Sequence, residues 1–213
     1  MVVFEFPPSN GSSVQRILSV YNGFVSDGWD VDVITAKEHA YEKVSPFDLS
    51  LLPENKNGNI VRTLALDVMR HLAFKGKHLQ WMIKPDRWGL TWIPSALAAG
   101  KKLVSKTPPD LIWSSAPTPS PHVIARQLAE VSGAKWIADY RDPMPYLHRP
   151  TNTKLDILHK EIDIKNKKSA DVFTFATEET MKTYQDLFSD DDGDFYKVMK
   201  NGFDSDLMKQ IKL

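Results

Sequence analysis

Residues 110–142 read DLIWSSAPTPSPHVIARQLAEVSGAKWIADYRD. Two short apolar runs in it, at 110–114 and 135–139, have the length of buried strands. Between them, residues 120–131 place apolar side chains at the spacing of a helix that buries one face. Parallel strands need a crossover of this kind, so the stretch predicts one strand–helix–strand unit of a parallel sheet.

The predicted helices have recognisable ends. Ser120 followed by Pro121 is a favoured helix start, and Gly133 favours a helix end. Ser12, with Gln15 three residues later, has the spacing of a capping box for an earlier helix. These residues separate the predicted helices from the loops beside them.

The same alternation continues along the whole chain. The predicted strands span 2–6, 31–34, 110–114, 135–139, 172–175 and 195–199, with a further short strand from residue 60. The predicted helices span 14–25, 64–83, 91–106, 120–131 and 178–187, with another that ends near residue 168. Residues 36–58 are predicted as a long surface loop with a short helical piece. The pattern predicts an α/β, Rossmann-like, doubly wound domain whose mainly parallel sheet carries helices on both faces.

The composition excludes several classes of protein. The chain has no cysteine, which excludes a disulfide framework, a thiolate metal site and a cysteine nucleophile, and suits a cytoplasmic location. The six histidines are scattered without an HExxH motif, and GxGxxG, P-loop and GxSxG motifs are absent, so we predict no metal and no cofactor. No apolar run reaches the roughly 20 residues of a spanning helix. The 27 basic and 27 acidic residues balance, which gives no indication of a nucleic-acid partner.

Three polar loops follow predicted strands, where doubly wound folds bind their ligands. In the loop 7–13, Gly11 before a helix N-terminus suits a bound phosphate or forms an ordinary capped turn. In the loop 114–122, His122 is expected to be neutral in a first helical turn, either binding a sugar hydroxyl or packing at the helix edge. In the loop 139–143, two aspartates bracket an arginine, as either an internal salt bridge or a charged ligand site.

In this order, the loops resemble the N-terminal domain of the retaining family 4 glycosyltransferases of the GT-B fold. The matching positions are Pro7, Pro8, Gly11 and Arg16, then Asp110 to His122, Asp139 to Pro143 and Val198 to Asp204. Two positions depart from the family pattern. The segment Trp113-Ser114-Ser115 lacks the histidine that lines the cleft near the transferred sugar in many family members, so that role is vacant or passes to His122. In addition, Lys200 replaces the proline that usually precedes Asn-Gly.

The resemblance implies a domain that binds the acceptor of a sugar transfer. Its partners would be a nucleotide-sugar donor, held mainly by a second domain, and a glycan or lipid-linked acceptor. Residues 1–200 would form the Rossmann-like domain, and residues 201–213 would begin the interdomain linker. No two glutamates have the family's seven-residue separation, so we expect the donor domain to be absent and this chain alone to be inactive. The sequence identifies no catalytic residue. The candidate substrate-binding residues are Asn10, Gly11, Ser12, Ser115, Thr118, His122, Arg141 and Asp142.

The zero net charge conceals two opposite segments. Residues 59–109 hold nine basic and two acidic residues, a net +7, whereas residues 171–206 hold ten acidic and three basic residues, a net −7. Tryptophan interleaved with basic residues suits the interface of an anionic membrane, so we expect peripheral binding at its inner face. Alternatively, the aromatic residues are core and the basic residues form a solvated face. The candidate membrane-facing residues are Lys75, Lys77, Trp81, Lys84, Arg87 and Trp88.

Two other functional classes remain open at this stage. A non-catalytic Rossmann-like module that binds a nucleotide, a sugar or a lipid headgroup would have the same strand and loop pattern. A receiver-like or flavodoxin-like signalling domain would need an acidic cluster after the first strand, where Pro7 and Pro8 stand instead.

Overall fold

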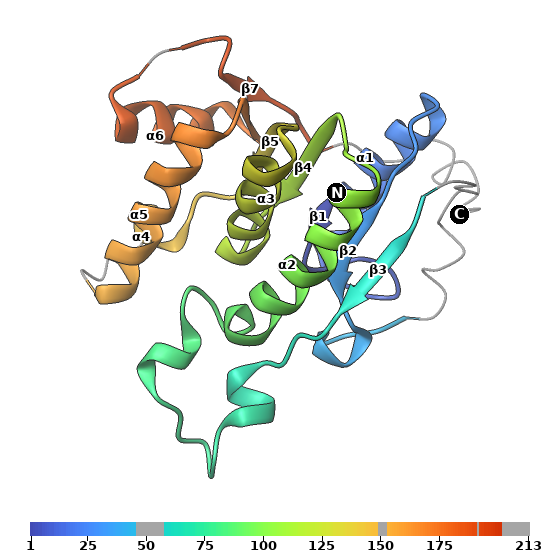
Figure 1. Ribbon diagram of the computed structural model, residues 1–213. Helices are drawn as coiled ribbons and strands as arrows, with labels where there is room; N and C mark the ends of the chain where they lie inside the picture. Colours follow the sequence, from blue (N-terminus) through green and yellow to red (C-terminus); the bar gives the residue numbers. More distant parts are fainter. Residues whose placement is uncertain (46–57, 149–152, 191, 202–213) are drawn as a thin grey trace, which may run out of the picture.

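A seven-stranded parallel sheet forms the centre of the molecule. The computed structural model describes residues 1–45, 58–148, 153–190 and 192–201. The strands are β1 (Val2–Val3), β2 (Val33–Ala36), β3 (Ile60–Thr63), β4 (Leu111–Ser115), β5 (Lys135–Tyr140), β6 (Val172–Phe175) and β7 (Tyr196–Val198). Their order is β3-β2-β1-β4-β5-β6-β7, and every neighbouring pair is parallel (Figure 1). The predicted fold class is therefore confirmed.

Helices cover both faces of this sheet, as predicted. They are α1 (Val14–Ser26), α2 (Gly89–Lys106), α3 (Pro119–Ser132), α4 (Pro145–His148), α5 (Lys154–Ser169) and α6 (Glu178–Phe188). Figure 1 shows α2, α3 and α5 in front of the sheet, where a large apolar cluster is buried. The opposite face packs a smaller cluster against α1, with Ile17 and Tyr21 from the helix and Val3 and Val33 from the sheet. Among the described residues, no helix combines the length and apolar character needed to cross a membrane.

Several predicted boundaries shift for local reasons. The first strand is two residues long rather than five, although Phe4 and Phe6 stay buried on opposite faces. Helix α1 has Ser13 rather than Ser12 as its N-cap, and no side-chain cap forms because the Ser13 hydroxyl donates to Glu5 instead. Helix α3 begins at Pro119 after its N-cap Thr118, two residues earlier than the predicted start at Ser120 and Pro121.

Helix ends and loops follow the remaining signals closely. Gly133 ends α3 in the left-handed conformation (φ 74°), as predicted from its position. A 3-10 turn at Glu38–Ala40 supplies the short helical piece expected in the 36–58 loop, of which residues 46–57 lie outside the described part. The predicted turn and linker after Asn201 lie outside it too.

The predicted helix over 64–83 is wrong. Residues 64–84, which we call the arm, contain a π-helical turn at Val68–Leu72 and a 3-10 turn at Gln80–Ile83. Between them Phe74 pairs with Lys77 in a tight turn, where Lys75 and Gly76 have positive φ values of 49° and 75°. This conformation is incompatible with a continuous helix. The arm projects from the bottom of the molecule in Figure 1.

The Asp139 carboxylate at the end of β5 joins segments that are distant in sequence. Arg16 of α1 donates to both of its oxygens, from Nε at 2.9 Å and from Nη2 at 2.6 Å. Ser115 of β4 and Thr174 of β6 donate to it as well, each at 2.8 Å. The remaining Arg16 nitrogen donates to the Met199 carbonyl, beyond β7, at 2.7 Å. One buried ion pair thus ties α1 to three strand ends and to the chain that follows the last strand.

A second buried carboxyl lies beneath the loop that follows β5. Asp163 of α5 is fully buried and accepts hydrogen bonds from Tyr140 at 2.9 Å and from Tyr146 of α4 at 2.7 Å. Tyr184 of α6 lies 3.5 Å from the same carboxyl and also accepts from the amide of Met144. Burial raises the pKa of Asp163 to about 7, although the tyrosine hydrogen bonds oppose the shift. The network anchors the segment between β5 and α4.

We expect Asp139→Asn to lower the free energy of unfolding by about 3–5 kcal/mol, because it leaves the buried Arg16 cation uncompensated. Urea denaturation measures the effect, and Arg16→Met with Asp139→Asn completes a double-mutant cycle that should show strong coupling. Lys135→Gln, which breaks the exposed Lys135–Asp171 pair, is the control and should change stability little. Equal effects of Asp139→Asn and Lys135→Gln would contradict this role.

The titration of Asp163 should make the folded protein less stable as pH rises. Its folded-state pKa is raised from 3.8 to about 7, so the folded chain keeps a proton that the unfolded chain has lost. This contribution is complete below about pH 4 and disappears by about pH 7, a change of up to about 4 kcal/mol. We expect the stability difference between the native protein and Asp163→Asn to shrink over this interval, measured by urea titration at several pH values. Parallel pH profiles for the two proteins would refute the assignment.

Candidate functional site

A cavity of about 410 Å³ opens where the strand order reverses between β1 and β4. This is the position at which doubly wound sheets bind ligands, and the volume lies in the range of small-molecule sites. Four separate segments line it: the loop after β1, residues 40–43 after β2, residues 115–118 after β4 and Arg141 after β5. Trp88, just before α2, and Phe4 complete the wall.

Six of the eight candidate substrate-binding residues come together at this cavity. They are Asn10, Gly11, Ser12, Ser115, Thr118 and Arg141. Their convergence follows from the parallel sheet, because the carboxyl ends of its strands meet at one edge. The other two, His122 and Asp142, do not line it.

His122 is buried in the core rather than exposed to the cavity. It lies in the first turn of α3, with Nδ1 2.8 Å from the Ser114 hydroxyl and its ring 4.5 Å from that of Tyr140. Trp136 donates to the same hydroxyl at 2.9 Å, so Ser114 links the imidazole of His122 to the indole of Trp136. Burial lowers the pKa of His122 to about 4 and Asp139 opposes the shift. The expected neutral form is present, and burial is its main cause.

The two aspartates around Arg141 have different partners. Asp139 pairs with Arg16 in the core, whereas Asp142 is exposed and accepts from Arg141 Nε at 2.8 Å. Of the internal salt bridge considered for this loop, the Arg141–Asp142 half is present, whereas Asp139 pairs with Arg16 of α1. Arg141 keeps its place in the cavity wall while its Nε donates to Asp142.

A carboxylate that the sequence analysis did not single out faces the cavity. Glu5 accepts a hydrogen bond from Ser13 and lies so close to Gly11 that an added Cβ there would collide with it. A larger residue at position 11 would have to displace the Glu5 carboxylate from its place beside the first loop. The available signal was a single charged residue within an otherwise apolar strand.

Two buried polar atoms on residues of the cavity wall have no hydrogen-bond partner in the described part of the protein. They are the indole Nε1 of Trp88 and the hydroxyl of Thr118. Buried polar groups are nearly always paired, so unpaired ones at a cavity indicate a ligand or water that supplies acceptors. Both atoms are shielded from solvent, whereas the charged groups of Glu5 and Arg141 line the same cavity and are within direct reach of a bound molecule.

Asp86 fixes the wall that carries these two atoms. Its buried carboxylate accepts from the amides of Trp88 and Gly89 at the start of α2, at 3.1 and 2.9 Å, and from Ser120 in α3 at 3.0 Å. Burial raises the pKa of Asp86, and these hydrogen bonds oppose the rise. One carboxylate therefore holds two helix starts in register beside the cavity.

The candidate membrane-facing residues divide into two groups. Lys75, Lys77 and Trp81 are exposed on the arm, with Lys84 partly exposed at its end. Arg87 forms ion pairs with Asp67 and Glu42, and Trp88 packs its ring 4.4 Å from that of Phe4. Arg87 and Trp88 thus belong to the body of the protein. Across the residues that the structure describes, no group of histidines and carboxylates has the arrangement of a metal site.

Comparisons with known proteins find relatives by structure only. No family model and no curated protein sequence matches the chain. It superimposes on Anabaena Alr3699/HepE crystallised with UDP-glucose (TM-score 0.56, 11% identity, 96% of this chain, 44% of that one). The same protein with UDP and glucose gives 0.56 at 14% identity, over 96% and 45% of the two chains. A UDP-N-acetylglucosamine 2-epimerase gives 0.55 at 11% identity, over 99% and 52%.

These likenesses concern the fold. The chain spans about half the length of each of these proteins, as one domain of a two-domain fold would. It therefore has a GT-B-like, Rossmann-type domain, as the loop motifs of the sequence indicate.

Proposed function

We propose that the chain is the N-terminal, acceptor-binding domain of a retaining family 4 glycosyltransferase. The full enzyme would move a sugar from a nucleotide-sugar to a glycan or lipid-linked acceptor. One observation carries the proposal: three loops that match the family in sequence converge on a single cavity at the reversal point of the sheet. The structural neighbours crystallised with UDP-glucose and with UDP and glucose support a sugar-nucleotide ligand.

Each wall of the cavity has a role in this proposal. The Gly11 loop, at the N-terminal end of α1, lies near the donor phosphates, where backbone approaches closely and the helix dipole favours negative charge. The loop Ser115–Thr118 and Arg141 face the acceptor. Transfer with retention passes through an oxocarbenium-like transition state, which would form at the open side of the cavity, between the two domains.

The structure bears on the histidine that the resemblance leaves uncertain. His122 is buried with its Nδ1 bonded to Ser114, so we propose a packing role for it rather than contact with the sugar. In its place, the Glu5 carboxylate and the Arg141 guanidinium are the polar groups that would bind acceptor hydroxyls.

The proposal extends to the cellular setting of the enzyme. A cytoplasmic protein that uses a lipid-linked acceptor has to reach the membrane surface, and the basic segment 59–109 favours association with anionic lipids. We propose peripheral association at the inner face of the membrane.

The 213-residue chain alone should not catalyse transfer, because the groups that hold most of the donor would lie on a second domain. The measurement is release of UDP from UDP-glucose in the presence of candidate acceptors. A transfer rate from this chain by itself would overturn the proposed division of labour. Tight binding of a nucleotide-sugar by the isolated chain would instead favour an autonomous binding module.

Gly11→Ala should weaken ligand binding without unfolding the protein, because its new methyl group displaces the Glu5 carboxylate in the cavity. Titration with UDP, followed by backbone amide NMR, should perturb residues 10–13 and 115–118 in the native chain. We expect Gly11→Ala to weaken that binding about fivefold or more, the equivalent of one lost hydrogen bond.

The matched control is Gly23→Ala in the middle of α1, where an added methyl group meets nothing within 4 Å. It should raise stability by about 0.5–1 kcal/mol through helix propensity and leave UDP binding unchanged. Equal UDP affinity in the two variants, or no perturbation of the cavity amides, would contradict the assigned site.

A further inference from the structure

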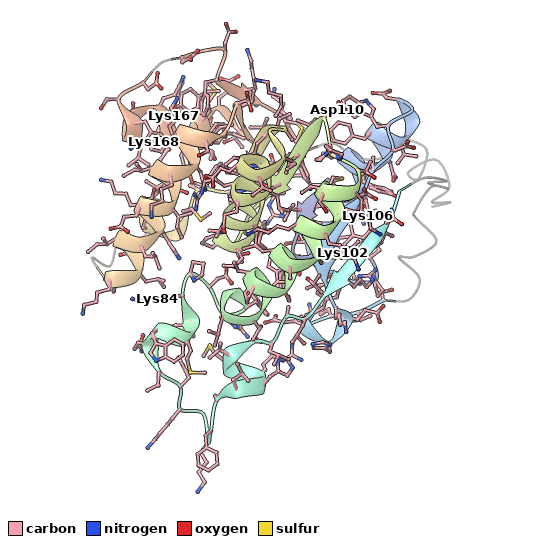
Figure 2. All side chains as sticks on the ribbon, viewed as in Figure 1. Lys84, Lys102, Lys106, Asp110, Lys167 and Lys168 are labelled. Carbon is pink, nitrogen blue, oxygen red and sulfur yellow. The ribbon has the colours of Figure 1, made fainter. Side chains whose placement is uncertain are left out.

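The arm carries an unusual concentration of exposed apolar side chains. Among the described residues, twelve large apolar side chains are exposed, and six of them lie within these 21 positions: Leu64, Met69, Leu72, Phe74, Leu79 and Trp81. Phe74, at the tip, is 77% exposed, the largest exposed fraction of the twelve. Figure 2 shows side chains at the tip of the arm extending away from the rest of the molecule. Exposed apolar groups gathered in this way mark an interaction surface.

The base of the arm is held firmly while its tip is free of the body. Val68 is buried, its amide donates to the Arg87 carbonyl at 2.9 Å, and Asp67 forms an ion pair with Arg87. The tip itself is closed only by the two backbone hydrogen bonds between Phe74 and Lys77, at 3.0 and 2.9 Å. The apolar side chains are therefore presented on a fixed support rather than on a collapsed loop.

The positive charge of the arm favours an anionic partner. Between Asp67 and Asp86 the chain has four cationic residues, Arg70, Lys75, Lys77 and Lys84, and no acidic residue. Within the described residues, none of the four lies within ion-pair distance of a carboxylate. Lys75 and Lys77 flank the apolar tip, an arrangement in which the side-chain stems lie in lipid and the ammonium groups reach phosphate.

The rest of the molecule has the opposite charge at the opposite end. The segment from β6 to β7 carries the acidic excess, and Figure 1 shows α6 and β7 at the top of the molecule, away from the arm at the bottom. An anionic surface attracts the arm and repels this acidic end, so the charge distribution imposes one orientation.

We propose that the arm inserts its apolar tip into an anionic lipid bilayer, with the acidic α6–β7 end directed away from the surface. This deepens the peripheral association proposed above, because it names the inserting residues and the orientation. Trp88 of the cavity wall follows the arm by four residues, so a docked protein holds its cavity beside the bilayer. A lipid-linked acceptor would then enter the cavity without leaving the membrane.

Cosedimentation with lipid vesicles tests the proposal. The native protein should bind vesicles of phosphatidylcholine with phosphatidylglycerol, and should bind phosphatidylcholine alone far more weakly. Phe74→Ala with Leu79→Ala and Trp81→Ala should reduce binding at least tenfold, because the inserted apolar area is lost. Val131→Ala with Ile157→Ala is the matched control, since both side chains are exposed apolar groups outside the arm.

The charges are tested in the same assay. Lys75→Gln with Lys77→Gln should weaken binding by roughly 10- to 30-fold at physiological salt, whereas Lys160→Gln with Lys165→Gln on α5, outside the basic segment, should change it little. Absence of vesicle binding by the native protein, or equal binding by the arm and control variants, would overturn the proposal. Dimers that depend on the arm in light scattering, without vesicle binding, would overturn it in favour of a second copy as partner. The assay contains no nucleotide, so its outcome is independent of the proposed sugar transfer.

Discussion

The buried ion pair between Arg16 and Asp139 constrains the geometry of the whole binding edge. A buried guanidinium–carboxylate pair is stable only when both charged groups have all their hydrogen-bond partners. Here the hydroxyls of Ser115 and Thr174 donate the remaining hydrogen bonds to the Asp139 carboxylate. These donors come from β4 and β6, in register with Asp139 on the face of the sheet that α1 covers, and α1 supplies the arginine. The same pair therefore fixes the start of α1, the loop after β4 and the exit of the chain after Met199. Two of these segments are walls of the cavity.

The type and order of the elements could be predicted because they depend on local patterns. The apolar runs at 111–115 and 135–140 and the helix between them are visible in the spacing of side chains, and Gly133 marks the helix end. Once the sheet is parallel, its topology brings the polar loops to one edge, which is why six of eight candidate residues meet at one cavity. Local sequence pattern was therefore sufficient to predict the elements and the place of the cavity, because both follow the general rules of parallel α/β folds.

The remaining features depend on partners that spacing does not reveal. Periodicity in 64–83 predicted a helix, but six of its large apolar side chains are exposed rather than packed on the body, and the backbone turns at Lys75 and Gly76. The histidine at 122 has a polar neighbour on β4 that keeps it in the core. Glu5, Asp86 and Asp163 gain their importance from contacts made in three dimensions.

Direct contacts join the base of the arm to the wall of the cavity. Arg87 connects them directly, since its guanidinium binds Asp67 at the base of the arm and Glu42 in the cavity wall, at 3.3 Å for the latter. Asp86, its neighbour, fixes the helix starts that carry Trp88 and Thr118. The base of the arm and the cavity wall are therefore joined by direct contacts of two adjacent residues, Asp86 and Arg87. The basic arm lies at the bottom of the molecule in Figure 1, and the acidic α6–β7 end lies at the top.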